Sequence, residues 1–259
     1  RTKIYSRDRN LWHISHEGGE LESPANAPPE DVWMMTADPT AAPDTPQEIS
    51  VGFVAGSGTD GFNDASGATA QFNKPTGLAI DANGYVFVAN LLGPNVRMIA
   101  PDGVVTTLLS TGLTEPLGVA VHPTSGDVYV TEFRAHKVLA FQTSPSAPTA
   151  SPTAPTLPAL TWRAGDGTQD HSDGSLLAAA LEAPYHLAFD VGGDIVVAEP
   201  TRLRRITILG RADTFVGNGI NAHTPGMRLR ASLGGATGVA VDPAGTMFVA
   251  EFTVCVVSE

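Results

Sequence analysis

The sequence predicts an all-β protein of the β-propeller class, in which short four-stranded antiparallel sheets, called blades, repeat around one axis. Three observations support this prediction. A strand–turn–strand pattern recurs four times, a 21-residue segment recurs three times, and no long stretch has helical periodicity. The chain has 259 residues, 42% of them hydrophobic, which is enough to bury a core without cross-links.

The strand–turn–strand pattern joins a short apolar strand to a second strand rich in Val and Phe. Glycine in the turn between them supplies a positive φ at little cost. We expect first strands at residues 75–81, 116–122, 184–190 and 236–242, and second strands at 85–90, 128–132, 195–199 and 247–251. Third strands follow at 96–99, 137–141 and 203–206, and fourth strands at 104–108 and 211–215. A spacing of about 40 residues with variable insertions is typical of propeller blades.

The 21-residue segments, called the three windows here, are residues 55–75, 164–184 and 216–236. They align without a gap, with glycines at two shared positions and with Phe72, Leu181 and Leu233 at a third. We expect the glycines to turn the chain away from the outer strand of one blade. The apolar residue is expected to fill the space between neighbouring blades.

Several of these motifs resemble the NHL repeat family. They are Pro75-Thr-Gly-Leu-Ala-Ile-Asp81, Val86-Phe-Val-Ala-Asn90, Asn95-Val-Arg-Met-Ile99 and the glycine-rich start of each window. The resemblance covers about residues 50–258 and implies an NHL-type β-propeller. It departs from the family at His186, which replaces a glycine, and at Ala135-His136, which replace an asparagine.

The two ends of the chain predict partial blades. Residues 3–5, 11–14 and 48–53 are expected to be a second, third and fourth strand, and 254–257 a third strand. About four recognisable blades and these partial blades make five to six blades in a single domain over 1–259. The missing strands do not complement each other, so we expect a longer chain or a partner chain to complete the ring.

Two insertions between expected third and fourth strands are rich in proline. Residues 18–47 are Pro-rich, and residues 143–158 are rich in Ser, Thr and Pro. The second insertion has the composition of an extended, O-glycosylated segment of an extracellular protein, and equally that of a bare flexible loop. The candidate glycosylation sites are Thr143, Ser144, Ser146, Thr149, Ser151, Thr153 and Thr156.

The residues that end the second strands are the best candidate binding site. Asn90, Glu132, Glu199 and Glu251 are expected to form a ring on one face, followed by apolar and basic residues. The full candidate set is Asn90, Glu132, Phe133, Arg134, Glu199, Arg202, Glu251 and Phe252. We favour the simpler alternative, in which each carboxylate accepts hydrogen bonds from loop N–H groups of its own blade.

Metal binding and nucleophilic catalysis have little support. Asp166, Asp170 and Asp173 suit Ca²⁺ by composition but lack EF-hand spacing, and they align with an ordinary loop at residues 57–64. No nucleophile or phosphate-loop motif is present. The single cysteine, Cys255, excludes a disulfide within the chain and a multi-cysteine metal site, and we expect a buried thiol.

Charge and composition narrow the function. Lys and Arg number 15 against 27 Asp and Glu, a net charge of −12, so we expect no nucleic-acid binding. No apolar stretch approaches the roughly 20 residues that span a bilayer, so we expect no membrane insertion. The favoured function is a non-enzymatic scaffold in a larger extracellular or cell-surface assembly, bound to a protein partner or to itself; a cytoplasmic location is the other option. The alternatives are a metal-dependent hydrolase or lyase with a divalent ion in its channel, and a carbohydrate-binding propeller that needs Phe133 and Phe252 exposed.

Overall fold

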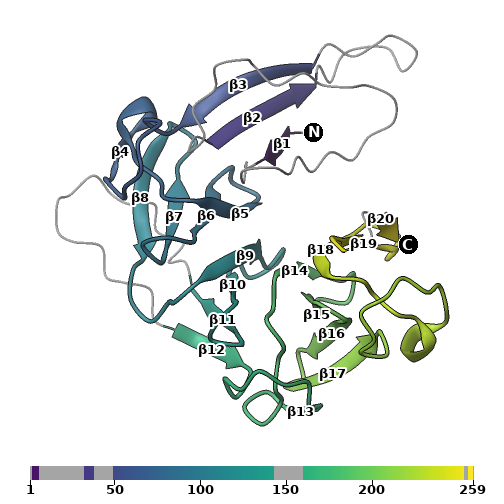
Figure 1. Ribbon diagram of the computed structural model, residues 1–259. Helices are drawn as coiled ribbons and strands as arrows, with labels where there is room; N and C mark the ends of the chain where they lie inside the picture. Colours follow the sequence, from purple (N-terminus) through teal and green to yellow (C-terminus); the bar gives the residue numbers. More distant parts are fainter. Residues whose placement is uncertain (1, 6–31, 38–48, 143–159, 254–255, 259) are drawn as a thin grey trace. The chain divides into compact units, whose positions relative to one another are not determined.

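The computed structural model describes residues 2–5, 32–37, 49–142, 160–253 and 256–258 (Figure 1). In this part of the chain, antiparallel sheets are joined by turns and by two one-turn 3-10 helices. The chain divides into two compact units, residues 1–110 and 111–259, which we describe separately. The predicted strand at 11–14, the insertion at 143–158 with its candidate glycosylation sites, and Cys255 lie outside the described residues.

The first unit contains two sheets. The strands β1 (Thr2–Tyr5), β2 (Val32–Ala37) and β3 (Ile49–Ala55) form the first sheet in that order. The second sheet has the order β4-β8-β7-β6-β5, and the short helix η1 (Gly67–Thr69) follows β4. Its strands are β4 (Ala65–Ser66), β5 (Pro75–Ile80), β6 (Val86–Asn90), β7 (Asn95–Ile99) and β8 (Val104–Leu109).

The strand β2 corrects one prediction from the sequence. The neighbour of β3 was expected to be residues 11–14, but β2 takes this place and lies within the Pro-rich range 18–47. Met34 is the Cα partner of Ile4 in β1 and of Gly52 in β3. The run of Val, Trp and Met in β2 suits a strand, and the prolines of this range flank it without interrupting the ladder.

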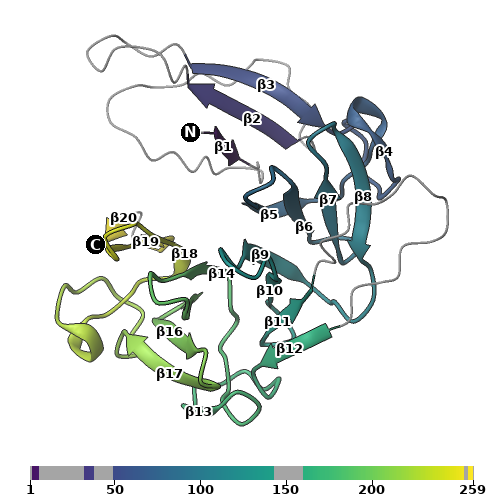
Figure 2. The same cartoon turned by 180° about the vertical axis from the view of Figure 1, so that it is seen from behind.

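The second unit contains three sheets, visible from both sides in Figures 1 and 2. The first has β9 (Pro116–Val121), β10 (Val128–Glu132), β11 (Lys137–Phe141) and β12 (Leu160–Ala164). The second has β13 (Gly174–Ser175), β14 (His186–Phe189), β15 (Ile195–Glu199), β16 (Arg202–Thr207) and β17 (Arg211–Val216). The third has β18 (Ala236–Val241), β19 (Met247–Glu251) and β20 (Val256–Ser258), preceded by the helix η2 (Arg228–Arg230). The innermost strand β14 contacts both β9 and β18.

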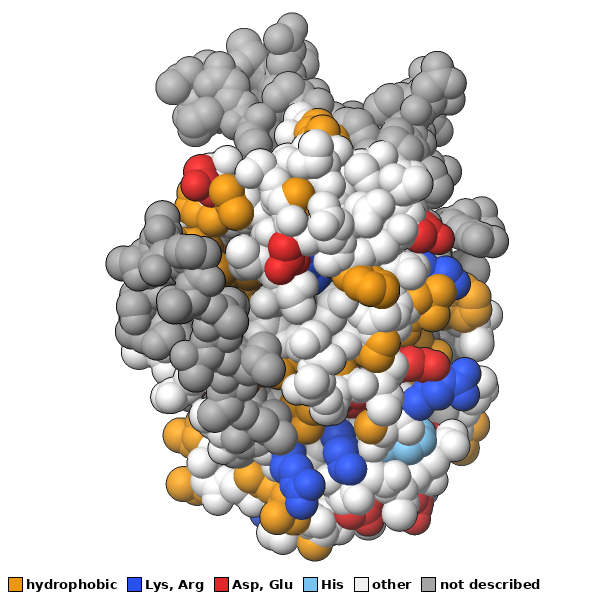
Figure 3. Space-filling view, turned by 90° about the vertical axis from the view of Figure 1, so that its left-hand side faces the viewer, with side chains coloured by type: hydrophobic (Ala, Val, Ile, Leu, Met, Phe, Trp, Pro, Cys, Tyr) orange, Lys and Arg blue, Asp and Glu red, His pale blue; other side chains and the backbone are white. Residues whose placement is uncertain are grey.

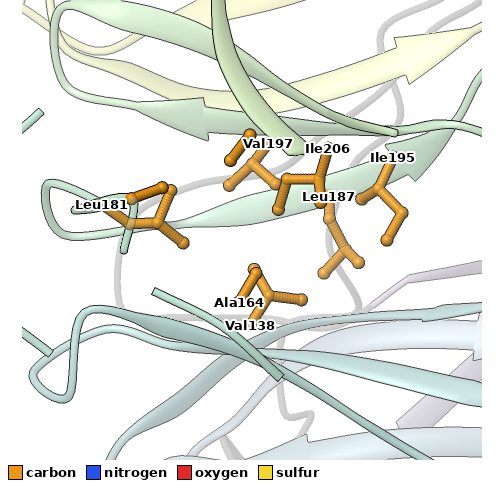
Figure 4. Packing of buried hydrophobic residues seen from close by; sticks show 9 residues of the cluster. Val138, Ala164, Leu181, Leu187, Ile195, Val197 and Ile206 are labelled. Atoms are coloured by element: carbon orange, nitrogen blue, oxygen red, sulfur yellow. The ribbon is translucent and has the colours of Figure 1, made fainter. Parts of the chain in front are cut away.

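Apolar side chains fill the space between neighbouring sheets of the second unit. Leu181 is fully buried with Val138 and Ala164 of one sheet and with Leu187 and Ile206 of the next (Figure 4). Leu233 has the equivalent place between the second and third sheets. The predicted role of the shared apolar residue of the windows is thereby confirmed in this unit, because each sheet hides one face against the next.

The three windows also share backbone hydrogen bonds. The first glycine N–H donates to the carbonyl oxygen eleven residues later, from Gly56 to Gly67 (3.1 Å), from Gly165 to Leu176 (2.8 Å) and from Gly217 to Arg228 (3.1 Å). These glycines have φ values of 133°, 98° and 99°, a region that side chains disfavour. The loop therefore starts with the same glycine conformation and the same hydrogen bond in all three windows. No helix among the described residues is long and apolar enough to cross a bilayer.

Candidate functional site

The four polar residues that end the second strands are buried. Asn90 and Glu199 have 0% relative exposure, Glu132 has 1% and Glu251 has 2%. They therefore present no polar atoms to a macromolecule at the surface. What they do inside each sheet decides between the two interpretations of the repeat.

Glu132 and Glu251 hold the loop that leads into the first strand of their own sheet. Oε2 of Glu132 accepts hydrogen bonds from the N–H (2.6 Å) and the hydroxyl (2.7 Å) of Thr114, two residues before β9. Oε2 of Glu251 accepts from the N–H of Gly234 (2.6 Å), two residues before β18, and Oε1 lies 3.0 Å from Nδ1 of His223. Hydrogen bonds to a carboxylate are among the stronger ones in proteins. For these two residues the repeated carboxylate therefore has a structural role, since it holds the loop before the first strand in place.

Glu199 occupies the same position without the same partners. Neither carboxylate oxygen makes a hydrogen bond of good geometry, although the backbone N–H of Glu182 and the fully buried Arg204, with Nη1 3.5 Å from Oε1, both favour the charged form. Burial raises the pKa of Glu199 from 4.5 to about 8, against the opposing charge of Arg204. Near neutral pH this side chain is therefore largely a neutral carboxylic acid.

Asn90 occupies the same position in the first unit. Its amide Nδ2 donates to Oδ1 of Asn95 (3.0 Å), its Cα partner on β7. An amide does not ionise, so the sheet of Asn90 has no titratable group at the position equivalent to that of Glu199. The four equivalent positions thus have three different hydrogen-bonding arrangements.

Of the other four candidate residues, only Arg134 and Phe252 are exposed. The side chain of Arg134 is 71% exposed and pairs with Glu115, with Nε 2.5 Å from Oε1, while Phe252 is 61% exposed. Phe133 is half-buried, and its ring centroid lies 4.9 Å from that of Tyr185. Arg202 is buried, 3.5 Å from Glu182. The exposed pair Phe133 and Phe252 that carbohydrate binding would need is therefore not present.

The three aspartates considered for Ca²⁺ have separate partners. Asp166 accepts from the N–H and hydroxyl of Thr168 (both 2.7 Å), which lowers its pKa. Asp170 lies beside His171, whereas Asp173 pairs with Arg204 at 3.0 Å. Among the described residues, no three His, Cys, Asp or Glu side chains are grouped so that they could hold a metal ion.

Sequence reasoning missed a buried arginine in each unit. Arg97 is fully buried, with Nη2 2.7 Å from Asp64 and Nη1 donating to the carbonyl oxygen of Gln71 (2.6 Å). Arg204 repeats this arrangement, with Nη2 3.0 Å from Asp173 and Nη1 donating to the carbonyl oxygen of Ala180 (2.8 Å). A signal for these pairs was present in the sequence. Arg97 and Arg204 have the same place in their third strands, and Asp64 and Asp173 have the same place in their windows.

Residues 217–235, which we call the arginine loop, form the second feature that sequence reasoning missed. This loop contains Arg228 and Arg230 and has no Asp or Glu. Three of its four large apolar residues are exposed, namely Ile220 (60%), Met227 (83%) and Leu229 (54%), whereas Leu233 is buried between sheets. In Figures 1 and 2 it is the yellow-green segment that loops out between β17 and β18. The face in Figure 3, by contrast, carries acidic and basic side chains in small mixed groups among the described residues.

The fold is that of a β-propeller, since the sheets are antiparallel and the similar solved structures are propellers. An auxiliary nutrient binding protein from Bacteroides thetaiotaomicron has a TM-score of 0.57 at 17% identity, over 84% of this chain and 53% of that one. A chain of a nidogen/laminin complex has a TM-score of 0.53 at 12% identity, over 85% of this chain and 66% of that one. Virginiamycin B lyase from Staphylococcus aureus has a TM-score of 0.51 at 12% identity, over 88% of this chain and 61% of that one. At these identities the likeness shows the fold alone.

The N-terminal segment has a different relationship. Residues 5–63 match the family described as the arginosuccinate synthase C-terminal domain. Argininosuccinate synthase of Shewanella loihica is 64% identical over 55 residues, 21% of this chain and 14% of that protein. The chloroplastic enzyme of Arabidopsis thaliana is 57% identical over 56 residues, 22% and 11%. The chain thus spans about a seventh of the length of the first of these relatives. The matched segment includes β2 and β3, and nothing in the repeat pattern signals it.

Proposed function

We propose that this chain is a non-enzymatic protein-binding module built on an NHL-type β-propeller of five to six blades. The observation that carries the proposal is the contrast between the repeated polar residues and the arginine loop. Glu132 and Glu251 are buried and committed to loops of their own sheets. Met227 and Leu229, in contrast, are exposed beside two arginines in a loop that the fold does not need in this form.

Support for a protein partner comes from the kind of side chains that are exposed. Protein interfaces are enriched in Met, Arg and aromatic residues, and their central contacts bury apolar groups. The arginine loop offers Met and Arg together, and Phe252 is also exposed. Self-association is the second form of this proposal, because a net charge of −12 provides acidic surface for such a loop.

Support for an extracellular or cell-surface assembly comes from two sources. One is the Ser/Thr/Pro composition of residues 143–158, which suits O-glycosylation. The other is the shared fold with a protein crystallised in a nidogen/laminin complex. This location is part of the proposal and has a direct test, which is mass spectrometry of the natural protein for glycans on this segment.

In this proposal, the segment that matches argininosuccinate synthase has a structural role only. It matches about a seventh of the Shewanella enzyme, so we carry neither the activity nor the substrates of that enzyme over to this chain. We propose that residues 5–63 contribute β2 and β3, with Ala55 at the end of β3 buried against Phe72 and Val88.

The alternative function is that of an enzyme, favoured by the lyase and the putative gluconolactonase among the proteins of similar fold. Assays of lactone hydrolysis and of virginiamycin B cleavage, with and without added Ca²⁺, Mn²⁺ and Zn²⁺, separate the two. The binding module is expected to give no turnover above that of a heat-unfolded sample. Metal-dependent turnover would overturn the proposal.

The positive test is selection of peptides from a displayed library on the purified, folded chain. A protein-binding module is expected to enrich peptides that share a motif and compete with one another, whereas the heat-unfolded chain should not enrich them. Light scattering over a range of concentrations tests the self-associating form. The proposal fails if no peptide is enriched and the chain stays monomeric at all concentrations.

A further inference from the structure

Resting on the proposed binding function, we propose that the arginine loop binds an acidic protein segment that carries at least one large apolar side chain. The proposal assigns the surface to residues 217–235 and the recognition to two arginines and their apolar neighbours. Charge, backbone conformation and side-chain stacking support it as three separate observations.

The first observation is the charge of the loop. Of the three windows, residues 55–75 contain two aspartates, and residues 164–184 contain three aspartates and a glutamate. The third window has none, and Pro225 stands at the position of Asp64 and Asp173. Among the described residues, no carboxylate lies within 4 Å of the guanidinium of Arg228 or Arg230. The two cations are therefore available to carboxylates of a partner.

The second observation is the backbone conformation of Arg228. Its φ is +45°, in the left-handed region that disfavours any residue with a side chain. The equivalent residue of the first window is Gly67, with φ +50°. A glycine therefore suits this turn, and the turn itself does not require an arginine. The chain thus carries a long charged side chain at a position where the backbone favours glycine.

The third observation is that the guanidinium is held in place before any partner binds. Cζ of Arg228 lies 5.5 Å from the ring centroid of Phe215, and its Nε donates to the carbonyl oxygen of Phe215 at 3.4 Å. Its terminal NH₂ groups remain for a bidentate carboxylate. The loop is also anchored by His223, which lies 3.0 Å from the buried Glu251. Such preorganisation reduces the entropy lost on binding.

An acidic protein segment fits this surface better than a nucleic acid or an anionic membrane. Both of those are extended polyanions, and the remainder of a chain with net charge −12 would repel them. A short segment that covers only the loop lies within about 8 Å of the two arginines, the distance over which charges act at physiological salt. Met227 (83% exposed) and Leu229 (54% exposed) would bury an apolar side chain of the segment.

The test measures binding of labelled synthetic peptides to the full chain by fluorescence anisotropy. One peptide set has several Asp and Glu around a central Leu or Phe, and its control set has Asn and Gln instead. We expect the acidic peptides to bind, with an affinity that falls as salt is raised, and the amide peptides to bind at least about tenfold more weakly. RNA and vesicles containing phosphatidylserine are measured in parallel.

Two variants locate the surface. Arg228→Gly removes the guanidinium and places glycine where the turn favours it, so this variant is expected to fold at least as well as the wild type. Together with Arg230→Ala it should weaken acidic-peptide binding by about tenfold or more. The matched control is Arg211→Ala, an exposed arginine of the same unit that pairs with Asp213 outside the loop, and this substitution should change binding less than about twofold.

The apolar contribution to peptide binding is tested by Leu229→Ser. Its control is Leu209→Ser, because Leu209 is 92% exposed on a turn outside the loop. Only the first substitution should weaken binding. The inference is overturned if acidic peptides do not bind, if the loop variants bind them as the wild type does, or if only RNA or vesicles bind through the loop. If library selection still enriches peptides in any of these cases, the proposed binding function stands and only the assignment to the arginine loop fails. The two failures are therefore distinguishable.

Discussion

Two windows of the second unit, residues 164–184 and 216–236, have the same length and opposite surface character. Both make the hydrogen bond from their first glycine to the carbonyl oxygen eleven residues later, and both bury a leucine between sheets. One exposes aspartates, whereas the other exposes arginines with Met and Leu. The comparison teaches that the glycines and the buried leucine set the loop, while its exposed side chains are free to diverge. Function is therefore best sought at positions where the repeats differ.

The largest expected effect tests the shared part of the two windows. Leu181→Ala removes a fully buried side chain from between two sheets and should lower the free energy of unfolding by about 2–5 kcal/mol. The matched control is Leu177→Ala in the same window, where the side chain is 55% exposed and the expected change is within about 0.5 kcal/mol. Urea denaturation measures both. Equal losses would contradict the division into buried frame and free surface.

The next effect concerns Glu199, whose carboxylate lacks the short hydrogen bonds that Glu132 and Glu251 accept. Its pKa is about 8 when folded and 4.5 by default, so the folded state keeps a proton that the unfolded state releases between these values. Stability from this group is therefore present below about pH 4.5, falls as the pH rises to about 8, and is constant above. Glu199→Gln should remove that fall and be more stable than the wild type at pH 9 by at least about 2 kcal/mol.

Thermal unfolding from pH 5 to pH 9 measures this difference, which corresponds to roughly 2–4 °C per kcal/mol for a chain of this size. Burial also raises the pKa of Glu132, but Glu132 is present in both proteins and cancels from the comparison. Parallel pH profiles for the variant and the wild type would show that Glu199 titrates at its ordinary pKa.

A smaller effect tests the aspartate that the two windows do not share. Asp173 accepts hydrogen bonds from the buried Arg204 (3.0 Å) and from the N–H of Thr214 (2.7 Å). Asp173→Ala leaves that arginine without this carboxylate and should cost about 1–3 kcal/mol, because hydrogen bonds to charged groups are lost. Pro225→Ala, the substitution at the same position of the other window, should leave stability within about 0.5 kcal/mol. If only Pro225→Ala lost stability, the stabilising role assigned to Asp173 would be wrong.

The smallest effect is on Arg228, whose φ is +45°. Arg228→Gly should raise the free energy of unfolding by up to about 1 kcal/mol, because glycine adopts this region without the steric cost. Arg230→Gly at the end of the same short helix is the control and should give no gain. Calorimetry of the two variants tests this. Destabilisation by Arg228→Gly would mean that its contact with Phe215 outweighs the backbone cost.

The sequence was sufficient for those features that depend on neighbours along the chain. The strands of residues 75–109 and their turns were predicted because alternating apolar residues and glycines are local signals. At one equivalent position of the predicted first strands, Val119, Leu187 and Val239 are buried, whereas Leu78 is half-buried. In contrast, β2 was missed because prolines on both sides of it masked a short strand-forming run.

The candidate site was harder to predict because its properties come from residues far apart in the chain. Arg97 and Asp64 are 33 positions apart, so their pairing depends on the folded loop. Glu132 and Glu199 are equivalent in sequence, yet only Glu132 accepts short hydrogen bonds from the loop before the first strand, which depends on the loop that each one faces. The arginine loop was visible as a segment without acidic residues, but its exposure was not.

Leu181 and Leu233 have a consequence for how the second unit opens. Each belongs to a loop of one sheet and packs against the next, so detaching one sheet uncovers apolar surface on its neighbour as well. Partial opening is then penalised at two interfaces, and amide protons of β10, β15 and β19 should exchange with a common free energy. A ligand that clamps a single loop would consequently slow hydrogen exchange across all three sheets.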